Sequence, residues 1–101
     1  MATTMHTLNE TDRKVIMHAI RTISGLRRNE VAEIMQSDPR TARRRLSAAM
    51  DEIIDNTITG ETLITARRVL IEASMFGTGD LCDAYKRLNV KLAGMLDGVI
   101  A

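Results

Sequence analysis

Hydrophobic residues recur at helical spacing along most of the chain. The first such stretch has apolar positions at Leu8, Val15, Ile16, Ala19, Ile20 and Ile23. Intervals of three and four residues predict an amphipathic helix that buries one face. Thr7 and Glu10 have the spacing of a capping box at its start, and Gly25 predicts a left-handed cap at its end.

Two further helices are expected before residue 56. The second runs from about Arg28 to Gln36 and is predicted to bury Val31, Ala32 and Met35. The third begins at Asp38, a good N-cap, followed by Pro39 at the first helical position. Its apolar face consists of Ala42, Leu46, Ala49, Met50 and Ile53. Its opposite face carries Arg40, Thr41, Arg43, Arg44 and Ser47, with Arg45 on the flank between the two faces.

Residues 56–65 allow two interpretations. The β-branched residues on both sides of Gly60 and Glu61 are compatible with a short hairpin. Helical spacing continues through Leu63, Ala66, Leu70, Ala73 and Phe76, and this favours a fourth helix capped near Thr59. The sequence therefore predicts an all-α fold, in which a helix-turn-helix core of three helices precedes two C-terminal helices. A short β wing at residues 56–65 is the alternative.

The last predicted helix has a regular apolar pattern. Six of its apolar residues are separated alternately by four and three residues: Leu81, Tyr85, Leu88, Leu92, Met95 and Val99. This repeat of 3.5 residues forms a narrow seam suited to a partner helix, and it predicts a homodimer. In the alternative interpretation, the seam packs on the first and fourth helices of the same chain.

Length and composition are those of a single domain, residues 1–101, in which 45% of the residues are hydrophobic. A single cysteine, Cys82, and two scattered histidines, His6 and His18, form no metal-binding pattern. We find neither a nucleophile arrangement nor a glycine-rich phosphate loop, so we expect no metal, no cofactor and no enzymatic activity. Without a signal-peptide pattern or a long apolar run, we expect a cytoplasmic protein that does not enter membranes.

Charge is distributed unevenly between the two halves of the chain. Residues 1–50 carry nine Lys or Arg against five Asp or Glu, whereas residues 51–101 carry five against eight. A basic half indicates a polyanionic partner. The two aromatic residues, Phe76 and Tyr85, lie in the acidic half, so the basic half offers no ring on which an unpaired base could stack. Duplex DNA is therefore the favoured partner.

The segment VAEIMQSDPRTARRRLSAAM, residues 31–50, resembles the helix-turn-helix of DeoR-type and related winged-helix transcriptional regulators. The resemblance covers about residues 28–50. The matching positions are Ala32 at the helix crossing, Met35 in the core, the Asp38-Pro39 cap, Thr41, the Arg43-Arg44 pair and Leu46. The sequence departs from the family pattern at Gln36-Ser37, where the family prefers a small or glycine-like residue followed by an apolar one, and in having no clear wing after the third helix. The resemblance implies a DNA-binding regulator, and the small size suits one of the phage or plasmid type.

These observations assign residues 7–55 to DNA binding and residues 56–101 to helical association. A helix-turn-helix inserts the first part of its second helix into the major groove. The candidates for base or near-base contacts are Arg40, Thr41, Arg43, Arg44 and Ser47, and those for phosphate contacts are Arg27, Arg28 and Arg45. The alternative function is that of a protein-interaction adaptor, whose arginine-rich helix binds an acidic partner and no DNA.

Overall fold

The computed structural model describes residues 5–76 and 79–100, with side chains as far as Asp97. Within these residues, five helices confirm the predicted all-α fold: α1 (Glu10–Ser24), α2 (Arg28–Met35), α3 (Pro39–Asp55), α4 (Gly60–Phe76) and α5 (Asp80–Ile100). None of these helices has a stretch long and apolar enough to cross a bilayer.

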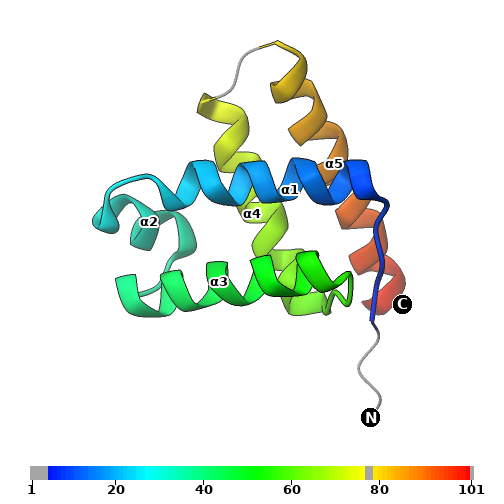
Figure 1. The fold of residues 1–101 in the computed structure, drawn as a ribbon, viewed down its shortest axis with the longest axis horizontal. Coiled ribbons are helices and arrows are strands. Elements are labelled where there is room, and N and C mark those ends of the chain that lie inside the picture. Colours follow the sequence, from blue (N-terminus) through cyan, green and yellow to red (C-terminus); the bar gives the residue numbers. More distant parts are fainter. Residues whose placement is uncertain (1–4, 77–78, 101) are drawn as a thin grey trace.

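The helices form two crossed layers (Figure 1). In the front layer α1 and α3 run side by side in opposite directions, and the short α2 joins them at one end. Behind them α4 crosses at a steep angle, and α5 returns along α4. The first part of α3 therefore lies at the same end of the molecule as α2, and its last part leads into α4.

The core consists of residues from each of the five described helices, from the segment before α1 and from the loop between α3 and α4. Its buried apolar residues are Leu8, Ile16, Ala19, Ile20, Ile23, Val31, Met35, Ala42, Leu46, Ala49, Ile53, Ile58, Leu63, Ala66, Val69, Leu70, Ala73, Tyr85, Leu88, Leu92 and Leu96. The inward face predicted for α3 is confirmed, except that Met50 is only half-buried. Ala32, which was predicted to be buried in α2, is also half-buried.

The ends of α1 differ from the sequence prediction. Asn9, not Thr7, is the N-cap, and its Oδ1 atom accepts a hydrogen bond of 2.8 Å from the Asp12 backbone N–H. Leu8 is buried, but it lies before the helix. At the other end, the predicted stop at Gly25 is confirmed, since Gly25 is the C-cap, but its conformation is right-handed, with φ −79° and ψ −8°, and not left-handed.

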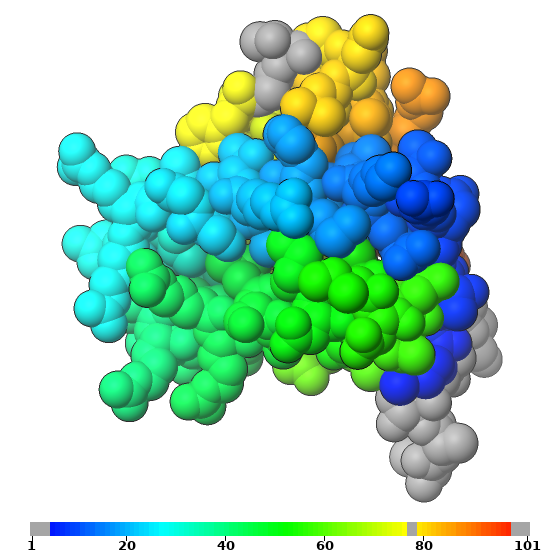
Figure 2. All heavy atoms as spheres, viewed as in Figure 1, coloured from blue at the N-terminus to red at the C-terminus, as the bar shows by residue number. Residues whose placement is uncertain are grey.

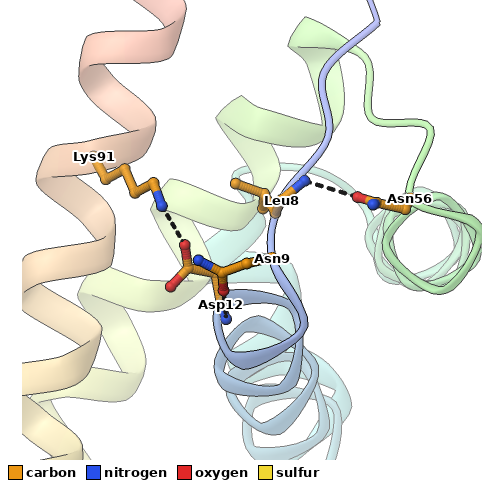
Figure 3. Close-up of polar contacts among 5 residues, drawn as sticks. All are labelled: Leu8, Asn9, Asp12, Asn56 and Lys91. Atoms are coloured by element: carbon orange, nitrogen blue, oxygen red, sulfur yellow. Dashed lines mark hydrogen bonds and ion pairs between the residues drawn. The ribbon is translucent and has the colours of Figure 1, made fainter.

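The loop between α3 and α4 is joined to the segment that precedes α1. Asn56 adopts a left-handed conformation with φ 57°, and its Oδ1 atom accepts a hydrogen bond of 2.8 Å from the Leu8 backbone N–H (Figure 3). His6 and Ile58 form an isolated antiparallel bridge through two backbone hydrogen bonds of 2.7 and 2.9 Å. These contacts fix the end of α3 against the N-terminal segment.

The alternative of a β wing at residues 56–65 is not found. The Thr59 hydroxyl lies 3.4 Å from the Thr62 backbone N–H, and α4 begins at Gly60. Glu52 supports this start, because its carboxylate accepts a hydrogen bond of 2.8 Å from the Thr59 backbone N–H. The preferred prediction of a fourth helix capped near Thr59 is therefore confirmed.

The apolar seam of α5 is occupied mainly by packing within the chain. Tyr85, Leu88 and Leu92 are buried in the core, whereas Leu81 is exposed and Met95 is half-buried. The Tyr85 hydroxyl also lies 2.7 Å from Nδ1 of His18 on α1. Val99 lies outside the residues whose side chains are described. The assignment of Tyr85, Leu88 and Leu92 to a dimer seam is thus corrected, because these side chains already pack on other helices of the same chain.

Candidate nucleic-acid interface

The first turn of α3 is fixed by Asp38. One carboxylate oxygen accepts a hydrogen bond of 2.9 Å from the Thr41 backbone N–H, and the other accepts one of 2.6 Å from the Thr41 hydroxyl. The Thr41 hydroxyl, and after it the Thr41 backbone N–H, hold the pKa of the Asp38 carboxyl below its ordinary value. Pro39 occupies the first helical position, where its fixed φ suits a helix. The Asp38 cap and the Pro39 backbone therefore both define where α3 starts.

The turn between α2 and α3 consists of Gln36, Ser37 and Asp38. Gln36 is left-handed, with φ 51° and ψ 43°, and the backbone N–H of Ser37 donates to the Ala32 carbonyl at 3.1 Å. This left-handed conformation suits glycine best. Gln36 adopts the left-handed conformation although glutamine tolerates it less well than glycine does.

The predicted arginines are exposed at the end of the molecule formed by α2 and the first part of α3. All six side chains are exposed: Arg27, Arg28, Arg40, Arg43, Arg44 and Arg45. Figure 2 shows side chains of both segments projecting from this end. The ion pairs found within residues 5–76 and 79–97 are Lys14–Glu10 and Lys91–Asp12. None of the six arginines is therefore neutralised by a carboxylate in the part of the chain that the structure describes.

The candidate base-contact residues lie on one side of α3. At 100° per residue, Arg40, Arg43, Arg44 and Ser47 fall within an arc of about 100°. Arg43 and Ser47 line a hollow of about 370 Å³ beside α1, whereas Arg44 and Arg45 line one of about 180 Å³ beside α4. The four side chains span about 10 Å along the helix axis.

Thr41 differs from the other candidates. Its side chain is half-buried, and its hydroxyl donates to Asp38. Its observed contact is therefore to the helix cap. This contact fixes the start of α3, which carries Arg40 and Arg43.

The second part of α3 is acidic. Asp51, Glu52 and Asp55 follow the arginines within the same helix, and Asp51 is exposed one turn beyond Ser47. Burial raises the pKa of Glu52, but hydrogen bonds from the Thr59 backbone and from the Thr62 and Thr59 hydroxyls outweigh this effect, so the pKa is lowered. Negative charge repels phosphates, so a polyanion would contact only the first part of α3.

Arg27 and Arg28 lie at the start of α2. Arg27 is the N-cap residue but makes no side-chain cap hydrogen bond, so its side chain does not satisfy the first backbone N–H groups of α2. An anion can accept hydrogen bonds from such groups and is favoured by the helix dipole. Nη1 of Arg45 lies 3.5 Å from Oγ of Ser37, which directs Arg45 towards the turn between the helices. Arg45 therefore lies at the turn between α2 and α3, whereas Arg27 and Arg28 lie at the other end of α2.

Two positions that support the interface were missed in the sequence. Asn56 ends α3, and Arg68 of α4 has Nη1 3.4 Å from the carbonyl oxygen of Ile34 in α2. Asn56 could have been found from its type, because asparagine is the residue after glycine that best tolerates a left-handed helix end. Arg68 gives no local signal, since its contact joins residues 34 positions apart.

Comparisons with protein-family models, with curated proteins and with solved structures found no match for this chain. Within the described residues, no group of three or more His, Cys, Asp or Glu side chains could hold a metal ion. The functional interpretation therefore depends on the geometry and charge of the chain itself.

Proposed function

We propose that the chain is a sequence-specific, double-stranded-DNA-binding transcriptional regulator that inserts the first part of α3 into the major groove. The observation that supports this proposal most strongly is a row of exposed arginines, without an ion pair to any described carboxylate, on a firmly capped helix that follows a short helix and a tight turn. Arginine is suited to the bidentate contact with the O6 and N7 atoms of guanine.

Affinity and specificity come from different residues in this proposal. Arg27 and Arg28 at the start of α2 and Arg45 beside the turn between α2 and α3 would bind phosphates and release counterions. Arg40, Arg43 and Arg44 would contact base edges or lie next to them. Ser47, one turn beyond Arg43, is the last polar candidate before the acidic part of the helix.

A duplex is favoured over a single strand by the placement of the aromatic residues. Tyr85 is 1% exposed, so its ring cannot stack on a base. Phe76 is exposed but lies at the end of α4, away from α2 and the first part of α3 (Figure 1). Binding to unpaired bases generally requires aromatic platforms beside the basic groups. The arginine-bearing end of this molecule provides the charge without the rings.

The proposal is tested by selecting duplexes from a random-sequence library in the presence of excess nonspecific competitor. We expect enrichment of a defined motif, bound about 10³-fold or more tightly than scrambled duplexes. Retention of duplexes without any enriched motif would contradict sequence-specific recognition. If no duplex is retained while a polyglutamate peptide binds to Arg40, Arg43 and Arg44, the adaptor alternative replaces DNA binding.

A further inference from the structure

The outward side of α4 is apolar. Its exposed residues are Glu61, Ile64, Ile71, Met75 and Phe76, and four of these five are hydrophobic. Ile64, Ile71 and Met75 are 55%, 42% and 70% exposed. At 100° per residue, these three fall within an arc of about 40° and form a straight stripe about 16 Å long. We call Ile64, Ile71 and Met75 the α4 stripe.

The opposite side of α4 is already buried. Thr62, Leu63, Thr65, Ala66, Val69, Leu70 and Ala73 pack into the core of the chain. A helix that is apolar on both sides is typical of one that is covered on both sides. Beside the stripe lies a hollow of about 350 Å³, lined by Ile34 and Gln36 together with Ile64, Arg67, Arg68, Ile71 and Glu72. This surface can therefore accept side chains from a partner.

We propose that the α4 stripe packs antiparallel against the same stripe of a second copy of this chain. In a two-fold arrangement centred near residue 70, Ile64 of one copy lies at the height of Met75 of the other. Ile71 then lies near the two-fold axis and contacts the stem of Arg68 from the second copy. The stripe is thus complementary to itself along its whole length.

The charged residues at the edge of the α4 stripe support a second copy of the chain as its partner. Arg68 and Glu72 are both half-buried and lie on the same flank of the stripe, about 40° and 80° from Ile64. In an antiparallel two-fold pair, residues on the same flank of the two helices face each other. With the centre near residue 70, Arg68 of each copy faces Glu72 of the other, which gives two opposite-charge contacts by symmetry. An unrelated partner would not need this match.

This inference stands on the surface of α4 and does not require DNA binding. Its failure and that of the proposed function are distinguishable, because the mass of the protein is measured without nucleic acid. Sedimentation equilibrium should give about twice the 11.2 kDa mass of the chain at protein concentrations of about 100 μM. A monomer at this concentration would overturn the proposal.

Two aspartate variants localise the interface. Ile71→Asp should give a folded monomer, because it places a charge near the two-fold axis of an apolar contact. Val90→Asp is the matched control, since Val90 is 71% exposed on α5 and lies outside the stripe. It should remain dimeric. The proposal is wrong if Ile71→Asp is as dimeric as the wild type, or if Val90→Asp dissociates the dimer equally.

Charge reversal tests the register. Arg68→Glu and Glu72→Arg should each raise the dimer dissociation constant about tenfold, because two attractive contacts become repulsive. An equimolar mixture of the two variants should associate as tightly as the wild type, since each glutamate then faces an arginine. Failure of the mixture to associate better than either variant alone would contradict the antiparallel register. Circular dichroism on each variant verifies that the fold is retained.

Discussion

Asn56 should contribute more to stability than any exposed polar residue of the arginine-bearing end. It performs two tasks, because its backbone is left-handed with φ 57° and its Oδ1 atom accepts the hydrogen bond from Leu8. Asn56→Ala removes both. Alanine tolerates the left-handed region poorly, and the Leu8 N–H loses its partner in a partly buried position.

The expected loss follows from these two contributions. The left-handed conformation costs an alanine about 1 kcal/mol more than an asparagine, whose side chain can form local hydrogen bonds. An N–H left without a partner costs about 1–2 kcal/mol when its surroundings are partly dry. Asn56→Ala should therefore lower the free energy of unfolding by about 2–3 kcal/mol, a substantial share of the total of about 5–15 kcal/mol for a chain of this size. The corresponding fall in Tm is about 10–20 °C.

Urea unfolding followed by circular dichroism measures this loss and separates its two parts. Asn56→Gly tolerates the backbone conformation but lacks the acceptor, so it should lose about 1–2 kcal/mol. Asn56→Asp keeps an acceptor and should lose about 0.5 kcal/mol or less. The reasoning is refuted if Asn56→Ala is as stable as the wild type. Equal losses for the glycine and alanine variants would show that the left-handed backbone conformation contributes nothing to the loss of stability.

Three further predictions concern the interface, the core and the response to acid. Arg28→Ala should weaken binding to all duplexes similarly and reduce the slope of log K against log salt by about one unit, as measured by fluorescence anisotropy at several salt concentrations. Leu92→Asp should unfold the chain in circular dichroism instead of giving a folded monomer, because Leu92 is 0% exposed. The Glu52 pKa is lowered in the folded state, so its stabilising contribution is present above the ordinary value of 4.5 and lost as the pH falls through the folded pKa. Urea midpoints between pH 7 and 3 should consequently fall less steeply for Glu52→Gln.

Much of the front layer could be predicted from local sequence. The cap at Asp38 and the inward face of α3 depend on residues a few positions apart, so spacing alone identifies them. The same reasoning placed the arginines on the exposed side of α3. It selected Thr7 instead of Asn9 for the cap of α1 because both residue types can accept the cap hydrogen bond.

The second half of the chain shows where local pattern is insufficient. A seam such as Tyr85, Leu88 and Leu92 has the same spacing whether it packs on a helix of its own chain or of another. The structure places these three against the chain's own core, while Ile64, Ile71 and Met75 remain exposed on α4. Leu96, a core residue, was missed because it lies beside the seam pattern. Which apolar face remains exposed after folding depends on how the helices pack together, and this is not visible in the local sequence.

The central claim is that three arginines of α3 read the base sequence of duplex DNA. Its most direct test compares the wild type with the variant Arg40→Ala, Arg43→Ala, Arg44→Ala on the selected duplex and on a scrambled one, by fluorescence anisotropy. A second triple-alanine variant at Lys14, Lys86 and Arg87, exposed residues of α1 and α5, controls for the loss of three positive charges.

Each base contact is worth about 1–3 kcal/mol, so the α3 variant should lose at least about 100-fold in affinity for the selected duplex and most of its preference over the scrambled one. The control should keep that preference, because exposed charges more than about 10 Å from the DNA are screened. A folded α3 variant that binds both duplexes with the affinity and preference of the wild type would contradict the claim.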